Sequence, residues 1–135
     1  MRMGSFRSSS PPPNRLVLRT LSPPVVALLL LTPVMIAGGQ VLFKMTSTRL
    51  QASGAPFVQA VVDPVFIAAV ALYGTATILW IYVLKAVPLS FAYSFMALSF
   101  VFVPLLAWLF LGESVSGRAM VGIALIIAGL LVVQG

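Results

Sequence analysis

The run from Leu89 to Leu111 constrains this chain more than any other stretch of the sequence. It contains no ionisable side chain except the phenol of Tyr93. At a rise of about 1.5 Å per residue, an apolar helix of this length crosses the roughly 30 Å hydrocarbon layer of a membrane. Pro88 before the run suits the start of a helix, and Gly112 suits its end. The run therefore predicts a membrane-spanning helix followed by a short polar turn.

Three further apolar runs predict a bundle of four such helices. The chain has 135 residues, of which 61% are hydrophobic and only 7% charged, and a soluble domain of this size needs far more polar surface. The predicted fold class is therefore all-α, an integral membrane bundle of four transmembrane helices. They span about residues 24–45, 64–84, 88–111 and 117–133, and Pro33 and Pro104 should kink the first and third. Four helices enclose little volume, so we expect one chain to form half of a dimeric transporter.

The two ends of the chain indicate how it lies in the membrane. Residues 1–22 are rich in arginine, serine and proline and predict a disordered basic tail before a transmembrane domain of residues 23–135. The apolar run from Pro23 to Phe43 exceeds the roughly 7–15 residues of a signal-peptide core, which favours a retained helix over a cleaved signal. With the tail inside, the cytoplasmic segments hold Arg2, Arg7, Arg15, Arg19 and Lys85, and the outer side holds Lys44, Arg49 and Arg118. This bias favours two cytoplasmic termini, with an inverted or dual orientation as the alternative.

The connection between the first two helices is predicted to be a polar loop over residues 46–63. Within it, residues 57–62 suggest a short interfacial helix. Asp63 followed by Pro64 is a helix-start signal, with Asp63 as the cap. Small residues predict close helix contacts at residues 37–39 and at Gly122 and Gly129, the latter pair within this chain or between chains.

The residues that are missing exclude several functions. The chain has no cysteine and no histidine, which removes thiolate and imidazole metal sites, disulfides and the commonest nucleophile–base pairs. No phosphate-binding glycine loop and no catalytic dyad is present. The high pI, near 11.0, comes without a basic stripe interleaved with aromatic residues, so nucleic-acid binding is not expected. The sequence therefore predicts a protein that is not an enzyme and uses no cofactor or metal.

The charged residues predict a polar site near the outer membrane surface. With the tail inside, the first and third helices both end on the outer side. One surface then carries Lys44, Arg49, Asp63, Glu113 and Arg118, with Gln40 about a turn deeper. A pocket between these helices would bind a charged headgroup, its phosphate held by Lys44 and Arg118 and its cationic group by Glu113. The predicted substrate-binding residues are Gln40, Lys44, Tyr93, Glu113 and Arg118, with Tyr73 as an aromatic residue along the substrate path. The alternative is that Lys44 and Arg118 extend to lipid headgroups while Glu113 lies in an interfacial turn.

Motifs over residues 25–134 resemble the drug/metabolite transporter (EamA-like) superfamily, and within it the small four-helix flippase subunits for 4-amino-4-deoxy-L-arabinose-phosphoundecaprenol. The motifs are Gly39-Gln40 with Lys44, Val87-Pro88 before Ala92-Tyr93, Gly112-Glu113 before Val115-Ser116, and Gly122 to Gly129. The resemblance implies a flippase subunit of the bacterial inner membrane that moves a polyprenyl-phosphate-linked (amino) sugar or other small amphiphile. It also implies a homo- or heterodimer with a similar four-helix subunit, surrounded by membrane lipids.

A more distant resemblance is to the small multidrug resistance family of proton-coupled exporters. Tyr73 and Tyr93 fall where that family has substrate-site aromatic residues. The glutamate that this family has in its first helix corresponds here to Ile36, and Leu98-Ser99-Phe100 replaces its glycine-rich kink in the third helix. Without a carboxylate in the span, a proton and a cation cannot compete for one site. An exporter of cations or metabolites and a non-transporting membrane partner are therefore the alternatives to a flippase.

Overall fold

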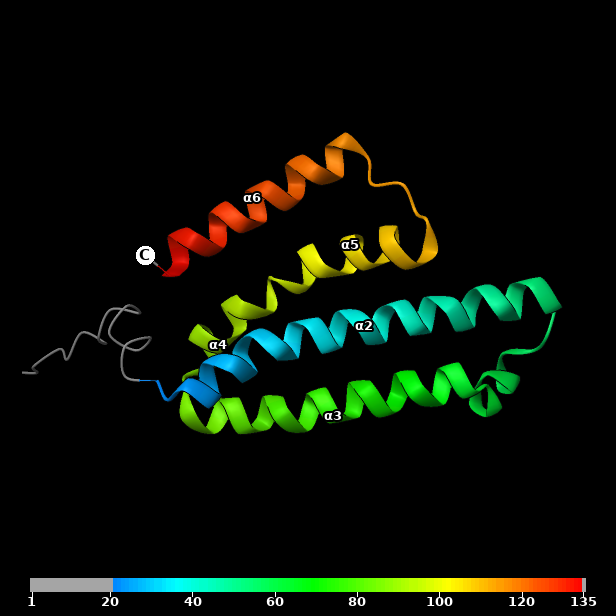
Figure 1. The fold of residues 1–135 in the computed structure, drawn as a ribbon, viewed down its shortest axis with the longest axis horizontal. Helices are drawn as coiled ribbons and strands as arrows, with labels where there is room; N and C mark the ends of the chain where they lie inside the picture. Colours follow the sequence, from blue (N-terminus) through cyan, green and yellow to red (C-terminus); the bar gives the residue numbers. More distant parts are fainter. Residues whose placement is uncertain (1–20, 135) are drawn as a thin grey trace, which may run out of the picture.

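The computed structural model describes residues 21–134 and is all-helical, as the sequence predicts (Figure 1). The predicted basic tail lies outside the described residues except for Leu21 and Ser22. The elements are α2 (Pro23–Ser53), the 3-10 helix η1 (Phe57–Val62), α3 (Pro64–Ala86), α4 (Leu89–Met96), α5 (Ser99–Leu111) and α6 (Gly117–Gln134). By length and composition, α2, α3 and the combined stretch Leu89–Leu111 can each cross a membrane, and α6 is a shorter apolar helix.

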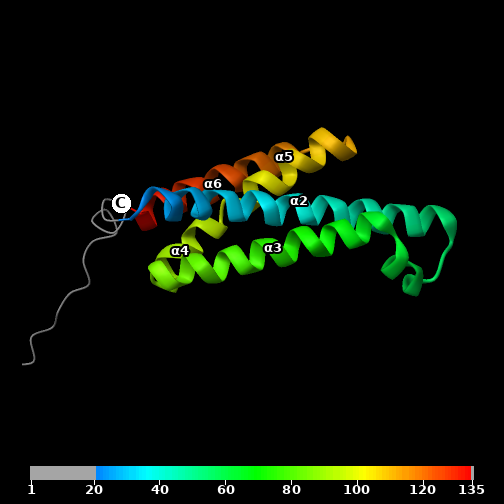
Figure 2. The same cartoon turned by 60° about the horizontal axis from the view of Figure 1, so that its bottom comes forward.

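Helix α2 forms the centre of the molecule. The antiparallel helix α3 packs along one side of it and α5 along another, and α4 leads from the end of α3 to α5 (Figures 1 and 2). Helix α6 lies outermost, beyond α5, and none of its residues up to Val133 is buried. A small apolar core forms where α3 turns into α4, around Leu29, Val83 and Phe91. The turn at Val87 and Pro88 therefore anchors α4 to the first turns of α2.

Helix α2 is longer than the sequence predicts, since it ends at Ser53 rather than near residue 45. The hydroxyl groups of Thr46 and Thr48 donate hydrogen bonds to the carbonyls one turn earlier, at distances of 3.2 and 3.0 Å. These polar side chains are thus satisfied within the helix. Gly54 then ends it with a φ of 64°, a conformation that glycine adopts without steric cost. As a consequence, Arg49 lies on a helix and not in a loop.

The interface between α2 and α3 depends on the small residues predicted for close packing. Gly39 faces the ring of Tyr73, and a Cβ atom at this glycine would lie 3.1 Å from Tyr73 Cδ2. Ala37, Ala69 and Ala76 are fully buried. Small side chains allow two helix backbones to approach closely in a membrane. Pro33 is also buried, and α2 continues through it as one helix.

The predicted third helix is divided into α4 and α5, and the division falls at Ala97 and Leu98 rather than at Pro104. Successive i→i+3 hydrogen bonds tighten the chain here, from the N–H of Leu98 to the carbonyl of Phe95 (3.0 Å) and from the N–H of Phe100 to that of Ala97 (3.1 Å). The hydroxyl of Ser99 donates to the carbonyl of Met96 at 2.7 Å. Such bonds compete with the regular α-helical pattern, so the helix changes direction before the proline is reached.

Candidate functional site

Lys44 and Glu113 lie opposite each other where α2 passes the end of α5. The Lys44 Nζ and Glu113 Oε1 atoms are 3.8 Å apart, and the two side chains are 55% and 50% exposed. Gly112, with a φ of 67°, ends α5, and the N–H of Glu113 donates to the carbonyl of Ala107 at 3.3 Å. This helix end fixes the backbone of Glu113, whose side chain reaches Lys44 on α2, while the following residues lead away to α6 (Figure 1). Two residues far apart in the sequence thus form one charged pair.

The charged pair divides a groove between α2 and α5, which we call the headgroup groove. Its inner part has a volume of about 230 Å³ and is lined by Gln40, Val41, Lys44, Val103, Ala107, Leu111 and Glu113. Its outer part has a volume of about 530 Å³ and is lined by Lys44, Met45, Thr48, Arg49, Ala52, Leu111 and Glu113. Both parts therefore share Lys44, Leu111 and Glu113. Among the described residues, the Gln40 amide has no hydrogen-bond partner, so its donors and acceptor face the groove's contents or lipid.

A second charged pair lies at the same end of α2, on the side that faces α3. Arg49 Nη1 is 3.8 Å from Asp63 Oδ1, and the Asp63 side chain is only 18% exposed. The same carboxylate oxygen caps α3, because it accepts hydrogen bonds from the N–H groups of Val65 (2.7 Å) and Phe66 (3.4 Å). The prediction of Asp63 as a helix cap is confirmed. The cap holds the carboxylate in place whether or not Arg49 stays beside it.

The structure brings together only part of the predicted site. Gln40, Lys44 and Glu113 share the headgroup groove. Tyr73 packs instead between α2 and α3, with its ring centroid 6.1 Å from that of Phe43. Tyr93 is 67% exposed and belongs to α4, which lies at the opposite end of the bundle from the end of α5 (Figure 1). Arg118 is exposed near the start of α6, forms no ion pair within residues 21–134, and is not among the residues that line the groove.

Two polar residues that line the groove were not among the predicted site residues. Thr48 and Arg49 were assigned to a loop, but the longer α2 carries both into the outer part of the groove. A signal for Thr48 was present in the sequence, because Gln40, Lys44 and Thr48 are each four residues apart and therefore follow one face of a helix. Arg49 had no such signal, since its place depends on where α2 ends.

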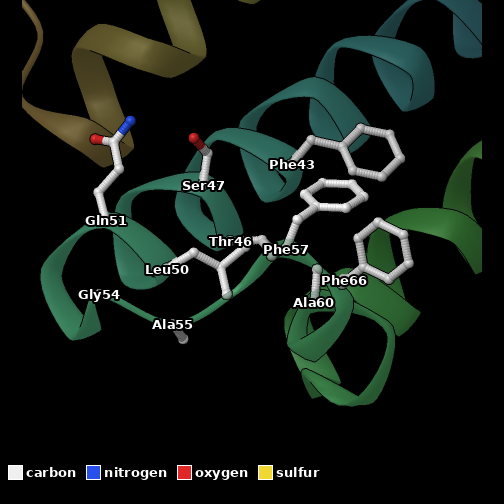
Figure 3. A pocket seen from close by; sticks show the side chains of 10 residues that line it. All are labelled: Phe43, Thr46, Ser47, Leu50, Gln51, Gly54, Ala55, Phe57, Ala60 and Phe66. Carbon is white, nitrogen blue, oxygen red and sulfur yellow. The ribbon is translucent and has the colours of Figure 1, made fainter.

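A separate hollow of about 580 Å³ lies on the other side of α2, between its last turns, η1 and the start of α3. Three phenylalanine rings, from Phe43, Phe57 and Phe66, gather on one side of it, and Gln51 extends away from them (Figure 3). The ring centroids of Phe43 and Phe66 are 5.8 Å apart. The residues that line this hollow carry no charge, so it offers a charged headgroup no partner for an ion pair.

The sequence of the chain matches that of a known family. Residues 8–134 match the model of the EamA-like transporter family. The chain is 36% identical over 110 residues to a protein of Aeromonas hydrophila subsp. hydrophila named as a probable 4-amino-4-deoxy-L-arabinose-phosphoundecaprenol flippase subunit, ArnE, and the match covers 82% of this chain and 96% of the relative. The proteins of the same name from Salmonella paratyphi B and Salmonella typhimurium are 42% identical over 59 residues, which is 44% of this chain and 53% of theirs.

No solved structure matches the chain. The family match spans all of the described residues, and the Aeromonas relative is matched over almost its whole length. The predicted resemblance is therefore confirmed, and with it the expectation of a membrane transporter that is not an enzyme. The chain belongs to the EamA-like transporter family.

Proposed function

We propose that this chain is one subunit of a flippase that moves a polyprenyl-phosphate-linked amino sugar across the bacterial inner membrane. The observation that carries the proposal is the headgroup groove, in which Lys44 and Glu113 face each other 3.8 Å apart with Gln40 beside them. The names of the Aeromonas and Salmonella relatives point to the same class of substrate. An ammonium group for a phosphate and a carboxylate for an amine match the two charges of such a headgroup.

The distance between Lys44 and Glu113 suits a site that opens for its ligand. A pair at 3.8 Å with half-exposed side chains is a weak one, because water screens its attraction. A zwitterionic headgroup can enter between the two groups and give each a new partner of opposite charge. The lipid tail would remain in the surrounding hydrocarbon, beside the exposed apolar faces of the helices.

Proton-coupled export of cations has less support. Both acidic residues of the chain, Asp63 and Glu113, lie just outside the ends of helices. Ile36 is a half-buried residue within α2, where an exporter of that kind has its carboxylate. A side chain without a titratable group cannot exchange a proton for a cation.

We also propose that the working unit is a dimer with a similar four-helix subunit and that both termini are cytoplasmic. Helix α6 supports the first point, because its residues up to Val133 are not buried by the rest of the described chain. Transporters of related design bind substrate between two halves. The word "subunit" in the relatives' name also suits a chain that acts with a partner.

The proposed function is tested by flipping in reconstituted vesicles. Vesicles would contain the full chain, alone and with a co-purifying four-helix subunit, and a polyprenyl-phosphate-linked amino sugar in one leaflet. An amine reagent that cannot cross the membrane reports the headgroups that arrive outside. We expect Lys44→Ala and Glu113→Gln each to lower the flipping rate at least about tenfold, since each leaves one charge of the headgroup without a partner.

The matched control is Lys85→Gln, at the other end of the bundle. Lys85 Nζ lies 5.1 Å from the centroid of the Tyr82 ring, outside the headgroup groove, so the rate should stay within about twofold of the wild type. Unchanged flipping by the Lys44 and Glu113 variants would refute the site. Export of cationic dyes without any flipping of lipid-linked sugars would refute the flippase proposal.

A further inference from the structure

We infer that Arg49, and not Arg118, is the second cation that binds the anionic part of the headgroup. The inference rests on the proposed function of the headgroup groove and names a further binding residue in it. Arg49 lines the outer part of the groove together with Lys44 and Glu113. Arg118 lies beyond the turn that ends α5, and is not among the groove's lining residues.

The placement of Arg49 follows from the length of α2. Residues 45, 48, 49 and 52 line the outer part of the groove, and this spacing marks one face of an α-helix. The face continues from Lys44 towards the membrane surface. A phosphate held by Lys44 would therefore meet the guanidinium group as its next neighbour along α2. The planar guanidinium offers several N–H donors that match two phosphate oxygens at once.

Asp63 does not compete strongly for Arg49. The two groups are 3.8 Å apart, and among the described residues no hydrogen bond joins them. Asp63 Oδ1 is already engaged by the N–H groups at the start of α3. The Arg49 side chain is 55% exposed, so its attraction to Asp63 is screened by water. A phosphate can thus replace Asp63 as the partner of Arg49 at little cost.

Each cation of the two ion pairs would thus exchange its carboxylate partner for the phosphate of the ligand. In the structure, Lys44 pairs with Glu113 and Arg49 pairs with Asp63. With a headgroup bound, both cations contact the phosphate, Glu113 contacts the amine, and Asp63 keeps its role as the cap of α3. The headgroup would lie with its phosphate towards Arg49 and its amine towards Glu113.

The test measures binding of farnesyl phosphate, a short polyprenyl phosphate, to the purified full chain by calorimetry. An uncharged detergent is used so that no lipid phosphate competes. We expect Arg49→Gln to weaken binding about tenfold, as the loss of a charge-assisted hydrogen bond would. Arg118→Gln removes the same charge outside the groove and should change the Kd less than twofold. Arg49→Lys should fall between the wild type and Arg49→Gln.

Two further variants separate a failed inference from a failed site. If Lys44→Gln weakens binding while Arg49→Gln is as harmless as Arg118→Gln, the groove stands and the assignment of Arg49 is wrong. If Lys44→Gln is also without effect, the proposed function loses its site.

Asp63→Asn keeps the helix cap but removes the competing charge, so binding should stay equal or become tighter. An equal fall of the melting temperature in Arg49→Gln and Asp63→Asn, with unchanged binding, would show a purely structural pair and overturn the inference.

Discussion

Asp63, at the groove end of the bundle, takes part in two kinds of contact. Its carboxylate caps α3 and lies beside Arg49 at the same time. The two roles can be separated because asparagine caps a helix nearly as well as aspartate, whereas alanine does not.

We therefore predict that Asp63→Ala lowers the free energy of unfolding by about 1 kcal/mol, through the loss of the cap. Asp63→Asn should lower it much less. Thermal unfolding in detergent, followed by tryptophan fluorescence, gives the comparison. Equal destabilisation by both variants would mean that the charge of Asp63, and not its hydrogen bonds to Val65 and Phe66, stabilises this end of α3.

At the scale of helices, close packing of α2 on α3 is the main contact in the described chain. A Cβ atom at Gly39 would lie 3.1 Å from Tyr73 Cδ2 and 3.8 Å from the carbonyl oxygen of Ala69. Gly122 on α6 offers a matched control, since a Cβ atom there meets nothing within 4 Å.

We predict that Gly39→Val destabilises the isolated subunit by about 1–3 kcal/mol, because the added side chain forces the two helices apart. Gly122→Val should leave the melting temperature of the isolated subunit within a few degrees of the wild type. Comparable losses in both variants would mean that α6 is packed as tightly as α2 in the folded subunit.

How far the sequence could predict these helices depends on what ends them. The four apolar stretches were predictable because a lipid-exposed backbone must form helices. The end of α2 was not, because Thr46 and Thr48 look like loop residues until their hydroxyl groups are seen to bond within the helix. Likewise the division at Ala97 has no mark such as proline or glycine, whereas Pro104, which has one, lies inside α5.

The same limit applies to the candidate site. Gln40 and Lys44 share a helix face, and Glu113 follows the glycine that ends α5, so local rules sufficed to group them. Tyr93 was grouped with them as a hydrogen-bond donor, yet it belongs to α4, and α4 lies at the far end of the bundle (Figure 1). The place of Arg118 depends on the path of the turn before α6, which no local rule specifies.

At the scale of the whole molecule, the orientation in the membrane decides what the groove can do. The headgroup groove, the Arg49–Asp63 pair and the turn after α5 all lie at one end of the bundle, and Lys85 lies at the other (Figure 1). If the basic tail is cytoplasmic, the groove opens towards the outer leaflet and would act in release of the headgroup. In the inverted orientation, the groove would open towards the cytoplasmic leaflet and would act in uptake of the headgroup from that leaflet.

The chain contains no cysteine, so single cysteines can report this orientation without any other change. We predict that Ser53→Cys and Ser114→Cys, both exposed at the groove end, react in intact spheroplasts with a maleimide that cannot cross the membrane. Ala86→Cys, exposed at the opposite end, should react only after the membrane is opened. The basic residues flanking the first helix provide the physical reason, because such segments are retained inside. The reverse pattern would assign the groove to the cytoplasmic leaflet, and labelling of all three in intact spheroplasts would indicate a dual orientation.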